Sequence, residues 1–148
     1  MSIPTIDPYL TFDGNCAEAM RFYERTLGGT LEVLMKASES PDPAMRPTPG
    51  AEGAARDPIL HASLLLGQQR IMASDSMGGM AYAGMRGISI TLGYDSAEEA
   101  RRVFDALAEG GRVEMPLTET FWAQAFGSVV DRYGTPWLVN GGAKDFEP

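Results

Sequence analysis

The feature that most constrains the fold is an internal repeat in the order of the expected strands and helices. A strand pattern at residues 6–12 precedes a helical pattern at 16–27, and three more strand patterns follow up to residue 75. The order then starts again with a strand pattern at 87–94, a helical pattern at 97–111 and three strand patterns up to residue 140. The repeat predicts an α+β fold built from two β-α-β-β-β modules.

The two expected helices also correspond residue by residue. The pair Ala17-Glu18 recurs 80 positions later as Ala97-Glu98, and a double glycine ends both helical patterns. Apolar residues correspond at the same offset: Met20, Tyr23 and Leu27 with Ala100, Val103 and Leu107. We therefore expect each helix to pack an apolar stripe on the sheet of its own module.

A single helix covers only one face of a sheet, so each module leaves its other face open. Two modules side by side would form a curved mixed sheet around a concave cup, with the helices outside. Concave apolar surfaces with a few polar groups are where small ligands bind. We predict one domain over residues 1–148, with modules at about 5–76 and 87–142 and a mobile proline-rich loop at about 38–58.

The charge balance excludes several classes of partner. The formal net charge is −8, whereas nucleic acids and anionic membranes attract basic surfaces.

No apolar run reaches the roughly 20 residues of a membrane span, and the first residues do not resemble a secretory signal. Cys16 is the single cysteine, which favours the reducing cytoplasm. It begins the apolar stripe of its helix, and we interpret it as a core residue rather than a nucleophile.

Four segments carry a resemblance to a known family: YLTFDGNCAEAMRFYERTLGG (9–29), ILHASLLLG (59–67), IMASD (71–75) and TFWAQAFGSVVDRYGTPWLVN (120–140). They resemble the PhnB-like branch of the glyoxalase, bleomycin-resistance and extradiol-dioxygenase superfamily, also called vicinal oxygen chelate. The resemblance spans Ile6 to Asn140 and implies a two-fold homodimer. Some members are labelled demethylubiquinone methyltransferases, but the chain has no glycine-rich nucleotide loop after a parallel strand, so we give that label little weight.

The resemblance also implies a metal, which catalytic members hold with His, Gln or Glu from strands of both modules. In this chain His61 stands where the resemblance places a ligand, whereas Trp137 and Leu138 stand where a carboxylate is expected. The first strand offers only Asp7, near its beginning. One imidazole does not make a tight divalent site, so we predict no metal and no other cofactor.

His61 is the only histidine, and it needs its own interpretation. Strand alternation places His61 and Ser63 on the face opposite Ala62 and Leu64, so both are expected to face the cup. Histidine there could act as a general acid or base, because its unperturbed pKa is near 6.5. It could equally be hydrogen-bonded to a neighbouring strand or to water. The residues alone leave both interpretations open.

Aromatic residues give the clearest functional signal. Tyr9, Phe121, Trp122 and Trp137 are candidate walls of the cup, which would suit a flat or apolar small molecule, although tryptophans also fill ordinary cores. We predict a small-molecule-binding protein of the glyoxalase/bleomycin-resistance type. The alternative is an enzyme, a lyase, isomerase or transferase, that uses His61 as acid or base on a small oxygenated or carbonyl compound.

Overall fold

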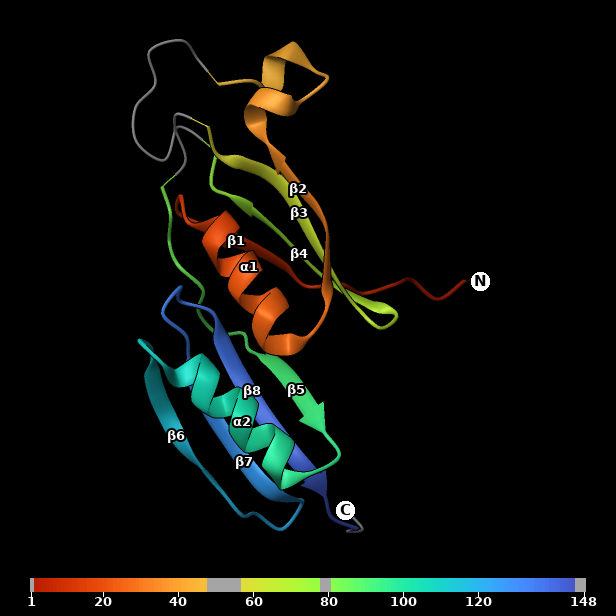
Figure 1. The fold of residues 1–148 in the computed structure, drawn as a ribbon, viewed down its shortest axis with the longest axis vertical. Helices are drawn as coiled ribbons and strands as arrows, with labels where there is room; N and C mark the ends of the chain where they lie inside the picture. The colour runs from red at the N-terminus through yellow and green to blue at the C-terminus, as the bar shows by residue number, and fades with distance from the viewer. Residues whose placement is uncertain (1, 48–56, 78–80, 146–148) are drawn as a thin grey trace. The chain divides into compact units, whose positions relative to one another are not determined.

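The computed structural model describes residues 2–47, 57–77 and 81–145. The chain divides into two units, residues 1–84 and 85–148, and each unit contains one of the predicted modules (Figure 1). We refer to them as unit 1 and unit 2.

Unit 1 is a four-stranded mixed sheet with one helix. The strands lie in the order β1-β4-β3-β2, with β1 parallel to β4 and the other neighbours antiparallel. The elements are β1 (Tyr9–Phe12), α1 (Cys16–Leu27), β2 (Thr30–Lys36), β3 (Ile59–Leu66) and β4 (Gln69–Asp75).

Unit 2 repeats this arrangement strand for strand. Its order is β5-β8-β7-β6, again with a parallel first pair and antiparallel neighbours after it. The elements are β5 (Ile90–Tyr94), α2 (Ala97–Ala108), β6 (Arg112–Thr118), β7 (Ala123–Val130) and β8 (Pro136–Ala143). The predicted α+β class and the two β-α-β-β-β modules are therefore confirmed, while a cup shared by both modules stays a prediction.

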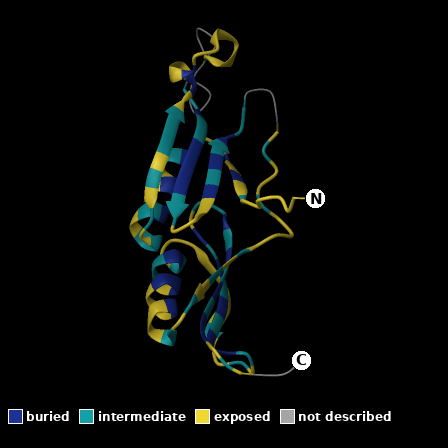
Figure 2. Ribbon diagram, turned by 90° about the vertical axis from the view of Figure 1, so that its right-hand side faces the viewer, coloured by how far each residue is buried: buried dark blue, intermediate teal, exposed yellow. Residues whose placement is uncertain are grey.

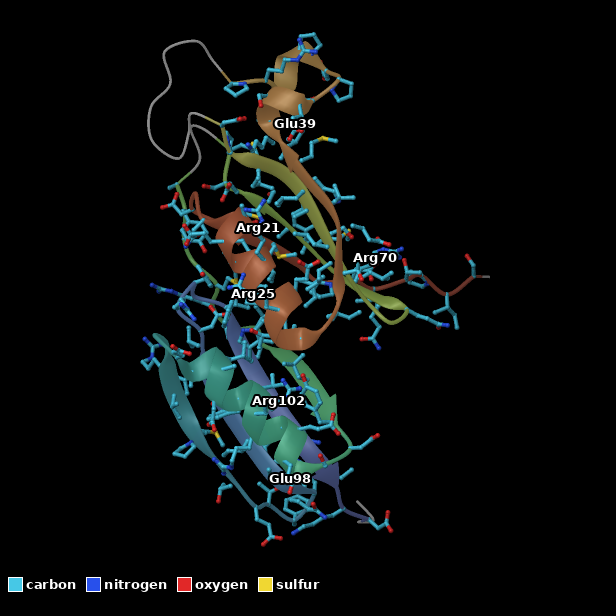
Figure 3. The ribbon with its side chains drawn as sticks, viewed as in Figure 1. Arg21, Arg25, Glu39, Arg70, Glu98 and Arg102 are labelled. Atoms are coloured by element: carbon cyan, nitrogen blue, oxygen red, sulfur yellow. The ribbon has the colours of Figure 1, made fainter. Side chains whose placement is uncertain are left out.

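Each helix is buried along one stripe and exposed along the other. The buried residues are Cys16, Ala19, Met20, Phe22 and Tyr23 on α1, and Ala100, Val103, Phe104 and Leu107 on α2. Charged residues occupy the exposed stripes, among them Arg21 and Arg25 on α1 and Glu98 and Arg102 on α2 (Figure 3). None of the helices in the described residues is long and apolar enough to cross a membrane.

The two helices begin in different ways. The hydroxyl of Ser96 accepts a hydrogen bond from the Glu99 N–H at 3.2 Å and so caps α2. Asn15 occupies the corresponding position before α1 but makes no capping bond with its side chain. Instead Asp75, at the end of β4, accepts hydrogen bonds from the N–H groups of Gly14 (2.9 Å) and Cys16 (3.0 Å).

The predicted proline-rich loop lies partly in the described residues. Two short 3₁₀ helices, η1 (Ala37–Glu39) and η2 (Pro43–Met45), follow β2. The backbone N–H and the hydroxyl of Ser38 both donate to the carboxylate of Asp57, at 2.9 and 2.8 Å, and this contact joins the two ends of the loop. Residues 48–56 lie outside the described part of the chain.

Candidate functional site

Each sheet has one face packed against its helix and one face that the helix leaves open. In β8 a Cβ built on Gly141 would lie 2.4 Å from the Cβ of Ala100, so Gly141 faces α2. Strand alternation then turns Trp137 and Val139 toward α2 and turns Leu138 and Asn140 away from it. Buried and more exposed residues alternate along most of β7 and β8 accordingly, and Figure 2 colours the strands by burial. We call the side away from the helix the open face of each unit.

The open face of unit 1 carries the pair Tyr9 and His61. The Tyr9 hydroxyl lies 3.2 Å from His61 Nδ1, and the direction of this hydrogen bond depends on the imidazole tautomer. Their rings are stacked, with centroids 5.8 Å apart and planes at 25°. No hydrogen bond to His61 Nε2 occurs within the described residues. The structure thus brings two of the predicted site residues together.

Ser63 lies on the same strand as His61 but is much less accessible. It is 5% exposed, and its ladder neighbours are Val33 on β2 and Met72 on β4. Tyr9, in contrast, is 48% exposed. Contact with a ligand is therefore easier at Tyr9 and His61 than at Ser63.

Phe121 and Trp122 form an aromatic cluster in unit 2 together with Phe126. The Trp122 ring meets Phe121 edge-on with centroids 4.8 Å apart, and meets Phe126 in the same manner at 5.1 Å. Phe121 is 69% exposed, while Trp122 and Phe126 are half-buried. Such edge-to-face contacts between aromatic rings are favourable.

Trp137 has a place in the core of unit 2. Its side chain has no exposed surface, and its Nε1 donates to Asp131 Oδ2 at 2.7 Å. Asp131 Oδ1 accepts from the N–H groups of Tyr133 and Thr135 in the turn between β7 and β8. A ligand contact by Trp137 stays a prediction, and it is the only one of the proposed ligand-binding residues that is completely buried.

A groove of about 610 Å³ lies within unit 2. Its walls include Leu138 and Ser128 from the open face, Ile88 and Ser89 from the segment before β5, and Arg112 from β6. Arg112 Nε and Nη2 both donate to Glu114 Oε1, at 2.9 and 2.7 Å, so this cation is already paired. The groove therefore combines apolar side chains with hydroxyl groups, the Arg112–Glu114 ion pair and a second arginine, Arg86, and the predicted site residue Trp137 is also among its walls.

Asn140 is a candidate site residue that the sequence interpretation missed. Its Oδ1 is buried and has no hydrogen-bond partner among the described residues. In the ladder it lies between Gly93 on β5 and Phe126 on β7. The available signal was a polar residue directly after the apolar run Trp137-Leu138-Val139. Whether that residue matters depends on the strand register, which the sequence alone does not show.

The residues around His61 do not match a divalent metal site. Its ladder partner is Met35, and the group bound to its ring is the Tyr9 hydroxyl, whereas such ions prefer several carboxylate or imidazole donors. Within the described ranges, no three His, Cys, Asp or Glu side chains gather in a way that could hold a metal.

Cys16 is fully buried at the start of α1. Burial, and to a smaller degree the charge of Asp75, raises the pKa of its thiol from 9.0 to about 12. A thiol in this state is a poor nucleophile, which agrees with its interpretation as a core residue.

Comparison with known proteins identifies the family. A family model described as 3-demethylubiquinone-9 3-methyltransferase matches residues 4–140. Protein YjdN of Escherichia coli (strain K12) is 38% identical over 140 residues, which cover 91% of this chain and 93% of that protein. Protein PA1353 from Pseudomonas aeruginosa has a solved structure with 46% identity and a TM-score of 0.84, covering 94% of this chain and 98% of that chain.

Two further solved structures connect this family to a wider fold. A putative 3-demethylubiquinone-9 3-methyltransferase, PhnB protein, from Bacillus cereus is 27% identical, with a TM-score of 0.74 and coverage of 93% and 99% of the two chains. A glyoxylase/bleomycin resistance protein/dioxygenase domain from Frankia sp. EAN1pec is 14% identical, with a TM-score of 0.63 and coverage of 95% and 99%, and shows the fold alone. The chain therefore belongs to the PhnB-like, 3-demethylubiquinone-9 3-methyltransferase family, a branch with the glyoxalase/bleomycin-resistance fold.

Proposed function

We propose that the chain binds a small apolar or aromatic molecule on the open face of unit 2. The observation that carries this proposal is the groove of about 610 Å³, because sites for small molecules in proteins span roughly 300–1,000 Å³. Leu138, Val130 and Pro136 give the groove an apolar lining, and Ser89 and Ser128 supply hydroxyl groups. This mixture matches sites that hold an apolar ligand and orient it with few polar contacts.

The aromatic cluster supports the same location. Phe126 and Ser128 follow one another on the same face of β7, so the cluster and the groove belong to one continuous surface. The rings of Trp122 and Phe126, which meet edge-on, offer aromatic area for contact with a ligand.

Intrinsic fluorescence tests this proposal, because the chain has two tryptophans in different environments. Trp122 belongs to the aromatic cluster, and Trp137, although fully buried, is among the residues that line the groove. Titration with flat aromatic compounds should quench the wild type, and Trp122→Phe should lose the part of the quenching that comes from the cluster while calorimetry still detects binding. A broad panel that produces neither quenching nor heat would exclude the proposal.

Catalysis is the second candidate, and the hydrogen bond between Tyr9 and His61 favours it. A phenol that holds one imidazole nitrogen leaves the other nitrogen positioned to move a proton. On any substrate that is found, His61→Ala should abolish turnover and Tyr9→Phe should reduce it. Unchanged activity of His61→Ala would remove this mechanism.

We also propose a cytoplasmic homodimer without a bound cofactor. Light scattering on the purified protein should give about twice the 15.9 kDa of one chain, and elemental analysis should find no stoichiometric divalent metal. A monomeric mass, or one metal ion per chain, would refute the corresponding part of this proposal.

A further inference from the structure

The Oδ1 atom of Asn140 is a buried hydrogen-bond acceptor without a donor in the described part of the chain. Leaving such an atom unpaired costs about 1–3 kcal/mol, so a group of this kind needs an explanation. The backbone around it is regularly paired: Asn140 forms ladder pairs with Gly93 and with Phe126. The missing hydrogen bond therefore concerns the side-chain Oδ1 and not the backbone of Asn140.

The side chain of Asn140 is directed to the open face of unit 2. The register between β5 and β8 runs without a shift from Ile90–Trp137 to Tyr94–Gly141, so strand alternation holds at Asn140. Its successor Gly141 contacts α2, which places Asn140 on the opposite side. Leu138, one position back on the same face, lines the groove.

The two ladder neighbours of Asn140 leave room on one side and provide an aromatic wall on the other. A Cβ built on Gly93 would meet no atom within 4 Å, so the space above β5 at this point is open. On β7 the ring of Phe126 stands next to Asn140 and is held by the edge-on contact with Trp122. A flat ring placed over Gly93 would thus lie beside both an aromatic surface and the amide.

From this juxtaposition we infer that Asn140 selects ligands that carry an O–H or N–H donor on an aromatic ring, with phenols as the simplest members of the class. The inference rests on the proposed function and adds the chemical class of the ligand. The ring packs against Phe126, and the donor pairs with Oδ1. An ether of the same shape has no proton to donate, so it leaves Oδ1 unpaired and binds less tightly.

Phenol and anisole provide a matched pair of probes, because they differ only in that the ether replaces the hydroxyl proton with a methyl group. Binding of each to the full-length chain is measured by calorimetry or ligand-observed NMR titration. The wild type should prefer phenol by about tenfold, the equivalent of one additional hydrogen bond. Asn140→Leu has nearly the same side-chain volume and no acceptor, and should lose the preference while still binding anisole.

Gly93→Val provides the second variant, because it fills the open space without removing the acceptor. It should weaken phenol and anisole alike, whereas Asn140→Leu should weaken phenol selectively. A purely structural role for Asn140 would not produce this difference between the variants. Thermal unfolding confirms that each variant is folded, and Asn140→Ala, which also lacks a side-chain acceptor, replaces Asn140→Leu as the comparison if the leucine variant fails to fold.

The outcomes separate the inference from the proposed function. If phenol and anisole bind the wild type equally, or if Asn140→Leu keeps the preference for phenol, the role of Asn140 is refuted while aromatic binding stands. If neither probe nor any member of the wider aromatic panel binds, the proposed function is refuted, and the inference with it.

Discussion

Units 1 and 2 have the same architecture, but they place their buried polar groups differently. The ladder pair Phe12–Asp75 in unit 1 corresponds to Tyr94–Gly141 in unit 2. Unit 1 has a buried carboxylate at this position, where Asp75 also accepts the N–H of Ile59 at 2.8 Å. Unit 2 has a glycine there, which lets α2 approach β8 closely. Duplication of a fold therefore does not imply duplication of the contacts that stabilise it.

The open faces of the two units also carry different residues. Unit 1 presents a hydrogen-bonded pair, Tyr9 and His61, whereas unit 2 presents a groove, an aromatic cluster and Asn140 Oδ1, an acceptor without a partner among the described residues. This difference is why we propose the ligand surface on unit 2, and the following predictions test its physical basis.

The largest effect is expected for the reactivity of Cys16, which is buried beside Asp75 in unit 1. Because the pKa of its thiol is raised from 9.0 to about 12, the thiolate fraction at pH 8 falls about 1,000-fold relative to the unfolded chain. A colorimetric disulfide reagent should react slowly with the native protein and rapidly in denaturant. The raised pKa also makes the free energy of unfolding depend on pH. The contribution of the Cys16 thiol to stability is fully present below pH 9 and is lost as the pH rises from 9 toward 12. Rapid labelling of the native state would show that the site around Asp75 is open.

Removal of the two buried carboxylates comes next. Asp75→Ala should destabilise the protein by about 3 kcal/mol, because three N–H groups from distant segments lose their acceptor. Asp131→Ala should cost about 2 kcal/mol, since the donors Tyr133, Thr135 and Trp137 lie within the next six residues. Urea unfolding measures both, with the exposed Asp105→Ala as the control. Equal losses for Asp75 and Asp131 would contradict the distinction between a tertiary contact and a local turn.

Two neighbouring glycines of unit 2 test the assignment of its faces. Gly141→Ala should destabilise by about 2 kcal/mol, because the new Cβ would collide with Ala100 and with the carbonyl oxygen of Ser96. Gly93→Ala should be close to neutral, because it adds a methyl group to open space. Thermal unfolding of the pair provides the measurement. A destabilised Gly93→Ala would mean that the open face is covered at that point.

The smallest effect concerns the helix starts. Ser96→Ala should cost about 1 kcal/mol through the loss of the cap on α2. Asn15→Ala should cost less than about 0.5 kcal/mol, since the side chain of Asn15 makes no capping bond and Asp75 accepts the N–H of Cys16, the first residue of α1. Chemical denaturation of both variants compares the two modes of capping, and similar losses would contradict the account.

Local patterns were sufficient to predict the elements of the fold. The double glycine after Leu27 ends α1 as expected, because Gly28 adopts φ 83°, which disfavours other residues. Helical spacing placed Met20 and Tyr23 in the core, and strand alternation distinguished His61 from Ala62. These features depend on neighbours a few residues away, so the sequence alone is informative about them.

The polar contacts could not be predicted, because they depend on register between distant strands. Asp75 meets Gly14 and Cys16 only after β1 and β4 pair in parallel. The open space beside Asn140 likewise arises because Gly93, 47 positions earlier, becomes its ladder neighbour. Sequence patterns indicated an aromatic surface, but the acceptor within it is a consequence of the three-dimensional pairing.

The most direct test of the central claim, that the ligand surface lies on the open face of unit 2, is a map of amide chemical-shift changes on titration with phenol. The account predicts the largest changes at the side-chain amide of Asn140 and at the backbone of Gly93 and Phe126, with small changes at Val139 on the α2 side. Changes concentrated around Tyr9 and His61 in unit 1, or at the helix-facing residues of unit 2, would contradict it.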